Sequence, residues 1–330
     1  MQPTLPTTMR AVRFHDWGTT LSVDTLPLPE PSGQESLVRI DAAAVAHLDV
    51  TVASGRFDIR PTLPYVAGVE GAGTVLSSPT MSPGTRVVVR GAGVGLTRSG
   101  TWAEYAAVPE DALTVLPEDL APEVAASFFV PGTTALAALD DVGRLGRWFE
   151  DVSAHDEVVV VTGATGAVGA MVTQLALARG CVVLAVVSRP ERAALVPVGA
   201  EIVVASRPEE VAGLAAARPG TLLVDTLGGP GLGDRAGWIR PGGRAALVGY
   251  TAGEDVSLHL PNWFSRDVAY LPVNMIQRTQ LARAAVPDLV SLLAAGTLML
   301  PVEVYALGDA QDAVDALRGR RASGRVVIQS

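Results

Sequence analysis

Lysine is absent from this sequence of 330 residues, and arginine supplies all 25 of its basic side chains. A Schiff base needs a lysine amine and the Walker-A phosphate loop needs a lysine ammonium, so both kinds of chemistry are excluded. Cysteine occurs once, as Cys181, and therefore permits no internal disulfide. This cysteine usage favours a reducing, cytoplasmic location.

Long apolar runs and basic tracts are also scarce. The chain is 48% hydrophobic, but Gly, Pro and Arg break its apolar runs well short of the ~18 residues of a membrane helix. The first residues do not combine a basic region with an apolar segment, so we expect no signal peptide. The formal net charge of -9 repels nucleic acid and anionic lipid, so we expect neither nucleic acid nor membrane as a partner.

The first third of the chain predicts short strands separated by turns. Strands are expected over residues 9–14, 37–44, 73–76 and 86–90, with a turn at Pro83-Gly84 between the last two. Strands without long helices between them predict an antiparallel, barrel-like unit.

The pattern changes after residue 157, where strands and helices alternate. A buried-type strand, Val158–Thr162, precedes helical spacing of Val168, Val172 and Leu175, and a second helix is expected over residues 191–198. Further strands are expected over residues 182–187, 202–205, 222–225 and 244–249. Such alternation predicts an α/β fold with a doubly wound parallel sheet. Residues after 267 predict one more strand, an amphipathic helix over 281–295 and a last strand over 325–328.

The turn after Val158–Thr162 carries a nucleotide-binding pattern. Gly163 suits the tight turn, Gly166 lets the backbone approach a pyrophosphate, and Gly169 allows close packing of helix on strand. The amides that open the helix offer a partial positive charge to phosphates. The other cofactor-binding candidates of this turn are Thr165, Ala167 and Val168. The alternative is a glycine-rich turn without a ligand.

The end of the second strand distinguishes NAD from NADP. NAD-binding proteins usually place Asp or Glu there to hold the ribose hydroxyls. This chain has Ser188 and Arg189, followed by Glu191 and Arg192. A hydroxyl and two guanidinium groups suit a 2′-phosphate, so NADPH is the predicted cofactor. The alternative is that both arginines are ordinary surface charges.

Four segments resemble the medium-chain dehydrogenase/reductase superfamily, and its zinc-free quinone oxidoreductases and enoyl reductases in particular. They are residues 68–73 (GVEGAG), 100–105 (GTWAEY), 131–135 (PGTTA) and 323–327 (SGRVV). The resemblance implies a GroES-like distorted β-barrel domain joined to a Rossmann domain, with the active site in the cleft between them. We expect the barrel-like catalytic domain in residues 1–125 and 267–330, and the Rossmann domain in residues 126–266. Many members of the superfamily are dimers, so a homodimer is expected.

The same resemblance bears on zinc. The catalytic zinc ligands of metal-dependent members would fall near Ala46, Val69 and Pro131, and none of these residues is a ligand. Zinc needs three or four N, S or O donors. The histidines are not clustered at ligand spacing; they are His15, His47, His155 and His259. We therefore expect no metal.

Without a metal, hydrogen bonds must polarise the substrate carbonyl. Related enoyl reductases often carry a tyrosine where this chain has Phe57, and related quinone oxidoreductases show Asn-Pro-x-Asp where only Asp49 survives. His47 is our first candidate for proton donor or substrate orienter; a structural loop histidine is the alternative. Asp49 either holds His47 or Arg56, or caps a helix.

Further candidates come from the fifth strand and from aromatic side chains. Gly249 and Tyr250 follow that strand at the edge where Rossmann ligands bind, and Tyr250 is a candidate contact of nicotinamide or substrate. By resemblance, Thr133 and Thr134 approach the nicotinamide. Aromatic stripes are as often core as pocket; the candidate pocket residues are Phe57, Tyr65, Trp102, Trp263, Phe264 and Asn274. For Tyr65, which precedes the Gly68 turn, a structural role is the favoured alternative.

Three functions follow. The first is an NADPH-dependent, metal-independent reductase of a conjugated C=C bond, an enone or a quinone. The second is a biosynthetic tailoring reductase, in which hydride addition to a polyene or enone triggers cyclisation; the missing polar groups at Ala46 and Phe57 motivate it. The third is a non-catalytic NADPH-binding protein.

Overall fold

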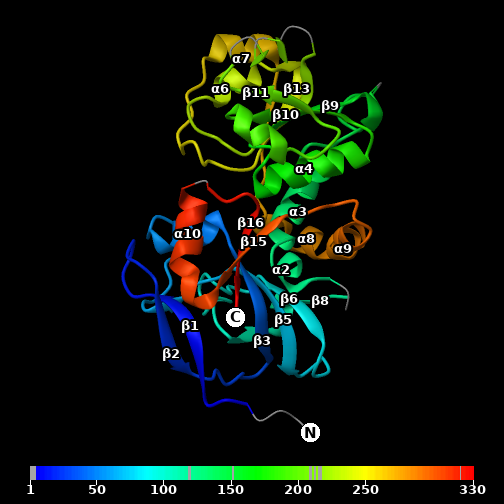
Figure 1. The fold of residues 1–330 in the computed structure, drawn as a ribbon. Helices are drawn as coiled ribbons and strands as arrows, with labels where there is room; N and C mark the ends of the chain where they lie inside the picture. Colours follow the sequence, from blue (N-terminus) through cyan, green and yellow to red (C-terminus); the bar gives the residue numbers. More distant parts are fainter. Residues whose placement is uncertain are drawn as a thin grey trace. The chain divides into compact units, whose positions relative to one another are not determined.

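The computed structural model describes residues 5–117, 120–150, 152–207, 210–211, 213–214, 218–319 and 321–330. The chain divides into two compact units (Figure 1). The barrel-like unit comprises residues 1–130 and 299–330, and the nucleotide-binding unit comprises residues 131–298.

The barrel-like unit is built from two sheets, as the short strands predicted. One has the strand order β2-β1-β4, and the other has the order β15-β16-β3-β5-β6-β8 with β7 paired to β3. All pairs are antiparallel except the parallel pair β15 and β16. The strands are β1 (Thr8–Phe14), β2 (Ser22–Pro27), β3 (Glu35–Val45), β4 (Tyr65–Val66), β5 (Glu70–Ser77), β6 (Arg86–Arg90), β7 (Tyr105–Pro109), β8 (Leu113–Val115), β15 (Val302–Ala306) and β16 (Arg325–Gln329).

The core of this unit lies on the inner faces of the strands. Several of these strands bury consecutive apolar residues, as Val87–Val89 of β6 do, and Val87, Val89, Ile40 and Val326 belong to one cluster. Its α-helices are α1 (His47–Ala53), α2 (Pro122–Ala125) and α10 (Ala310–Arg318). Strand β16 returns to this unit and pairs with β3, as predicted for residues 325–328.

The nucleotide-binding unit contains a six-stranded sheet in which every pair is parallel. Its order is β11-β10-β9-β12-β13-β14, which reads 3-2-1-4-5-6 when counted from β9. This is the order of a doubly wound dinucleotide-binding sheet, so the predicted architecture is confirmed. The strands are β9 (Val158–Thr162), β10 (Val182–Val187), β11 (Glu201–Val204), β12 (Gly220–Asp225), β13 (Ile239–Leu247) and β14 (Ala269–Pro272).

Short helices connect these strands. The longest is α4, which follows β9 directly and buries Val172 and Leu175 as its spacing predicted. In the described part of the unit the helices are α3 (Phe129–Leu136, which begins two residues before the unit does), the π-helix η2 (Ala137–Val142), the 3-10 helix η3 (Ala154–Asp156), α4 (Ala167–Ala178), the 3-10 helix η4 (Pro190–Leu195), α6 (Leu232–Ala236), α7 (Leu260–Arg266), the 3-10 helix η5 (Ile276–Arg278), α8 (Thr279–Ala284) and α9 (Val286–Ala294). None of the helices in the described part of the chain is long and apolar enough to cross a membrane.

Three predictions about boundaries are wrong. The expected return to the barrel at residue 267 comes too early, because β14 pairs with β13 and residues 267–298 belong to the nucleotide-binding unit. The helix expected over 191–198 is the 3-10 helix η4; Val196 precedes Pro197 and takes an extended conformation. The helix expected over 281–295 is divided into α8 and α9, with Pro287 in the first turn of the second.

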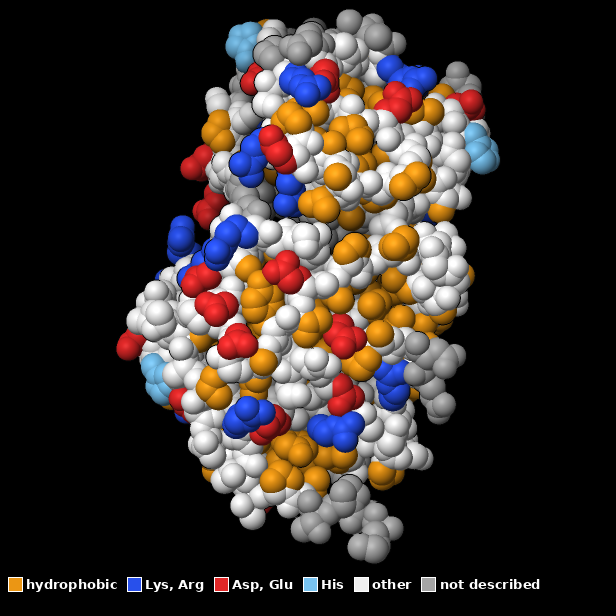
Figure 2. Space-filling view, viewed as in Figure 1, with side chains coloured by type: hydrophobic (Ala, Val, Ile, Leu, Met, Phe, Trp, Pro, Cys, Tyr) orange, Lys and Arg blue, Asp and Glu red, His pale blue; other side chains and the backbone are white. Residues whose placement is uncertain are grey.

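Exposed charges are compensated locally. Figure 2 shows basic and acidic side chains close together on the visible face. Arg98 pairs with Glu35 at 2.6 Å, and Arg10 pairs with Glu104 at 2.8 Å. Such exposed pairs contribute little to stability, about 0–1 kcal/mol each.

Candidate active site

The strand–turn–helix expected around the glycines is present. Gly163 follows β9 with φ +59°, a left-handed conformation that favours glycine. Gly166 precedes α4 and is exposed. A Cβ atom at Gly169 would lie 2.3 Å from the carbonyl oxygen of Gly163, so only glycine lets the helix pack this closely on the turn. The first amides of α4 are available to an anion at this end.

This turn lies where the strand order of the sheet reverses, between β9 and β12. Ligands of open parallel sheets bind at this point, beyond the carboxyl ends of the strands. Two hydrogen bonds join those ends: the Thr226 amide donates to Thr162 Oγ1 at 3.0 Å, and Thr226 Oγ1 donates to the Thr162 carbonyl at 2.8 Å. The turn after β9 and the loop after β12 therefore form one edge.

The loop after β12 is fixed by a buried ion pair that the sequence reasoning missed. Asp225 Oδ1 accepts from the amides of Leu227 at 2.9 Å and Gly228 at 2.7 Å, and Asp225 Oδ2 pairs with Arg235. Arg235 also donates to the Gly228 carbonyl. An Asp that ends a buried strand, with a Gly-Gly pair three residues later, is the signal that could have revealed this loop anchor.

The residues proposed for the cofactor phosphate lie at the end of β10. Ser188 and Arg189 are exposed, and Arg192 is half-buried. Arg192 Nε donates to Thr165 Oγ1 at 3.2 Å, which ties the segment after β10 to the glycine turn. The structure thus brings Thr165 and Arg192 together as neighbours.

The predicted nicotinamide contacts come from two other elements. Thr133 and Thr134 are buried in α3. Strand β13 ends at Leu247, and Gly249 and Tyr250 follow it. A Cβ at Gly249 would lie 2.6 Å from the Thr226 carbonyl oxygen, so this glycine packs on the loop after β12, while Tyr250 is 52% exposed.

In the barrel-like unit, Asp49 caps α1 and does not hold His47 or Arg56. Its Oδ2 accepts from the Ala46 amide at 2.8 Å, and its Oδ1 accepts from the amides of Gly68 at 3.2 Å and Val69 at 3.0 Å. The side chain is fully buried, and desolvation raises the pKa of its carboxyl to about 6. Asp49 is therefore a structural clamp, while His47 is exposed at the first position of α1.

A second buried carboxylate lies beside it on β5. Glu70 Oε2 pairs with Arg325 of β16 at 3.1 Å, and Glu70 Oε1 accepts from the Val130 amide at 3.1 Å. Burial raises the pKa of Glu70, and the Arg325 charge opposes that shift. This pair links the motif at 68–73 to the motif at 323–327.

The aromatic candidates of this unit differ in burial, and the prediction of Trp102 as a pocket residue is wrong, because it belongs to the core. Trp102 has no exposed surface, and its Nε1 donates to the Ala44 carbonyl at 2.9 Å. Tyr65 is buried, stacks on Phe14 and donates to the Gly95 carbonyl. Phe57 packs against the same core from a half-buried position.

Of the other candidates, Trp263 and Phe264 lie in α7, and Asn274 follows β14. Trp263 Nε1 donates to the Val268 carbonyl at 2.7 Å, and its ring stacks on Tyr270 at 5.6 Å. Phe264 is 69% exposed. Asn274 is exposed and uses its Oδ1 to accept from the Ile276 amide at 3.0 Å. These contacts give Trp263 and Asn274 local structural roles.

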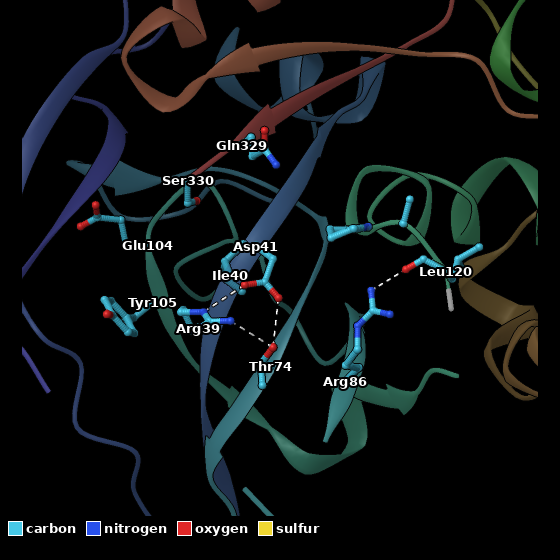
Figure 3. Close-up of a pocket in the computed structure, with 12 residues that line it drawn as sticks. Arg39, Ile40, Asp41, Thr74, Arg86, Glu104, Tyr105, Leu120, Gln329 and Ser330 are labelled. Atoms are coloured by element: carbon cyan, nitrogen blue, oxygen red, sulfur yellow. Dashed lines mark hydrogen bonds and ion pairs between the residues drawn. The ribbon is translucent and has the colours of Figure 1, made fainter. Parts of the chain in front are cut away.

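The barrel-like unit also contains an open cavity of about 800 Å3 that the sequence did not predict (Figure 3). Its charged side chains are mutually compensated: Arg39 pairs with Asp41 at 3.0 Å, and Thr74 donates to Asp41 at 3.0 Å. Arg86 donates to the Leu120 carbonyl. None of the predicted site residues is among the residues that line it.

Comparison with known proteins identifies the class. Residues 32–118 match the alcohol dehydrogenase GroES-like domain, and residues 167–295 match the zinc-binding dehydrogenase family. The chain is 30% identical to a probable mitochondrial zinc-binding oxidoreductase of Arthroderma benhamiae, over 98% of each chain. It is 29% identical to a putative quinone oxidoreductase of Bacillus subtilis, over 94% of this chain and 93% of that one. A solved quinone oxidoreductase of Pseudomonas syringae superposes with a TM-score of 0.84 at 25% identity, over 98% of this chain and 100% of that one.

The chain therefore belongs to the medium-chain dehydrogenase/reductase superfamily, as its motifs indicated. It is an oxidoreductase of that superfamily, similar to quinone oxidoreductases and alcohol dehydrogenases. Oxidoreductases of this superfamily bind a nicotinamide cofactor, and the glycine turn beside the switch point fits one.

The name of the matching family, zinc-binding dehydrogenase, implies a zinc ion, but the described residues do not supply a set of zinc ligands. Among the described residues, no three His, Cys, Asp or Glu side chains are grouped to hold a metal ion. At two of the expected ligand positions, Ala46 and Val69, the side chains are apolar, and the backbone amides of both are bound to Asp49. We derive no catalytic step through a metal.

Proposed function

We propose that this protein is an NADPH-dependent, metal-independent reductase that transfers hydride to a conjugated C=C bond, an enone or a quinone. The observation that carries the proposal is the edge formed by the glycine turn, Thr226 and the Arg192–Thr165 contact. Metal independence is supported separately by the apolar side chains of Ala46 and Val69, at the expected zinc-ligand positions. The substrate is a small molecule with a conjugated carbonyl, a polyene or a quinone.

The choice of NADPH is supported by the groups after β10. Ser188 and Arg189 are exposed at the strand end, where NAD-binding proteins place a carboxylate. Arg192 is held against the glycine turn through Thr165. Two guanidinium groups close to the adenosine end of a dinucleotide favour a 2′-phosphate.

The glycine turn, with Ser188, Arg189 and Arg192, would hold NADPH, and the bound cofactor would supply a hydride. The substrate accepts that electron pair at the β-carbon, its C=C π pair moves toward the carbonyl, and an enolate oxygen carries the charge. A proton then reaches the α-carbon. We propose exposed His47 or exposed Tyr250 as the donor, with water as the alternative source.

Cofactor preference tests the first part of this proposal. We expect Arg189→Ala to weaken NADPH binding by about tenfold or more, because a charge-assisted contact is worth about 1.5–3 kcal/mol, and to change NADH binding much less. Arg192→Ala should act in the same direction. Arg218→Ala is the matched control, since Arg218 is exposed in the same unit and pairs with Glu201. Equal weakening of NADPH and NADH, or none, contradicts the assignment.

Turnover assays separate the three candidate functions. Robust NADPH oxidation with simple quinones or enones supports the reductase and argues against a dedicated cyclising enzyme. A cyclised product from a polyene or enone supports the biosynthetic tailoring reductase. Bound NADPH that no electrophile oxidises supports the non-catalytic binding protein.

A further inference from the structure

Arg90 is the last residue of β6, and it is held differently from the other buried arginines. Val87, Val88 and Val89 before it are fully buried, whereas Arg90 is half-buried. Its one hydrogen bond to another described residue is a long one, from Nη1 to the Val69 carbonyl at 3.4 Å. An arginine has five N–H donors, so most of its donor capacity is available.

Arg244 shows what a structural arginine in this protein looks like. It has no exposed surface, and its guanidinium donates to Glu157 at 2.6 and 2.9 Å, to the Gly143 carbonyl at 2.6 Å and to the Thr221 carbonyl at 3.0 Å. Arg90 has no ion pair within 4 Å in the described part of the chain. Packing alone does not account for its placement.

Two carboxylates nevertheless lie near Arg90. Glu70 is its cross-strand neighbour on β5, but the oxygens of Glu70 bind Arg325 and the Val130 amide. The oxygens of Asp49 bind backbone amides. Burial lowers the pKa of Arg90, and the charges of the two carboxylates oppose that shift. Neither carboxylate forms a hydrogen bond with the guanidinium.

We propose that Arg90 is the oxyanion-binding residue of the barrel-like unit. Its guanidinium donates hydrogen bonds to a substrate oxygen that carries, or gains during reduction, a negative charge. The contact with the Val69 carbonyl places this cation beside the backbone segment that Asp49 also binds. The proposal rests on the proposed reductase function, because reduction of an enone or quinone is what builds charge on that oxygen.

The first test measures anion binding without turnover. 4-Nitrophenolate, at a pH where it is ionised, is titrated into the full-length protein with NADP⁺ bound and followed by its absorbance. We expect Arg90→Gln to weaken its binding about ten- to a hundredfold, and Arg90→Lys to weaken it less. Arg98→Gln, which removes an exposed arginine of the same unit, is the control and should bind as wild type.

The second test separates the two sources of the oxygen anion. With an uncharged enone, Arg90→Gln lowers kcat with little change in KM if Arg90 meets the developing enolate, and added guanidinium ion restores part of the activity. With a carboxylate-bearing enone, a rise in KM alone indicates that Arg90 holds the standing carboxylate. A merely structural arginine gives neither the split nor the rescue.

Different outcomes would contradict the role of Arg90 and the proposed reductase function. If Arg90→Gln retains nitrophenolate binding, kcat and KM, the assignment of Arg90 is wrong even though the reductase function stands. If both Arg90→Gln and Arg90→Lys lose cooperative unfolding and NADP⁺ binding, Arg90 is structural. If wild type reduces no enone or quinone but binds nitrophenolate through Arg90, the reductase proposal fails and the anion site remains.

Discussion

The carboxylate of Asp49 accepts a hydrogen bond of 3.0 Å from the backbone amide of Val69, twenty residues further along the chain. The same carboxylate holds the Ala46 amide that precedes α1. One buried side chain thus joins the start of α1 to the segment before β5. Asp49 positions the backbone, so its protonation state should affect the free energy of unfolding.

Asp49 should make stability fall as the pH rises from about 4 to about 6. Its folded pKa is about 6 and its ordinary value is 3.8, because burial penalises the charged form. Below the ordinary pKa of 3.8 the carboxyl is protonated and the folded state has the full benefit. This contribution, about 3 kcal/mol, is lost as the pH rises through the folded-state pKa of about 6. Urea unfolding of wild type and Asp49→Asn across this range should show the difference in slope.

The control for this experiment is Asp24→Asn. A hydrogen bond from Ser22 lowers the pKa of Asp24, so its contribution has the opposite sign and is lost as the pH falls. If wild type and Asp49→Asn keep parallel stability profiles between pH 4 and 6, the carboxyl of Asp49 is not perturbed.

Two glycines of the cofactor turn should separate folding from binding. Gly169→Ala places a Cβ 2.3 Å from a carbonyl oxygen and should cost about 1–3 kcal/mol of stability together with cofactor affinity. Gly166 is exposed and a Cβ there meets only the Gly163 carbonyl oxygen, at 3.2 Å. Gly166→Ala should therefore keep the melting temperature near wild type and raise the Kd for NADPH, because the methyl obstructs the approach of the pyrophosphate.

Thermal unfolding and NADPH titration measure both effects, with Gly308→Ala as the control because a Cβ there meets nothing within 4 Å. Unchanged NADPH affinity in Gly166→Ala would remove this turn from the cofactor site.

The buried pair of Arg244 and Glu157 should support the sheet without touching cofactor binding. Both side chains are fully buried, and Glu157 directly precedes β9, at the end of that strand opposite to the glycine turn. Arg244→Met leaves Glu157 as an uncompensated buried charge and should cost about 3–5 kcal/mol. Chemical denaturation checks this, and Arg218→Ala, which breaks an exposed pair, should cost about 0–1 kcal/mol. A small loss in Arg244→Met would contradict the role of this pair in stabilising the sheet.

A substitution at Trp102 tests whether this residue belongs to the core or contacts the substrate. Trp102→Phe removes the donor to the Ala44 carbonyl and leaves a void, so we expect a loss of about 1–3 kcal/mol in stability. Substrate KM should be unchanged, because the side chain has no exposed surface. A specific rise in KM with normal stability would return Trp102 to the substrate site.

The sequence alone predicted the parts that follow from local patterns. The valine run 158–162 and the glycines after it predict a buried strand, a tight turn and a helix, because period and turn chemistry are encoded within a few residues. The same locality explains the accurate strands Arg86–Arg90 and Val182–Val187. The motifs were sufficient for the superfamily.

Only the tertiary structure decided which groups meet. Residues 267–298 join the nucleotide-binding unit through the pairing of β14 with β13, and a pairing partner is not written in a strand's own residues. Trp102 lies in the core, and the carboxylate of Asp49 binds the Val69 amide. Glu70, the cross-strand neighbour of Arg90, is bound instead by Arg325, more than two hundred residues away. Burial and hydrogen-bond partners are set by long-range packing, whereas the glycine turn is set by the residues that form it.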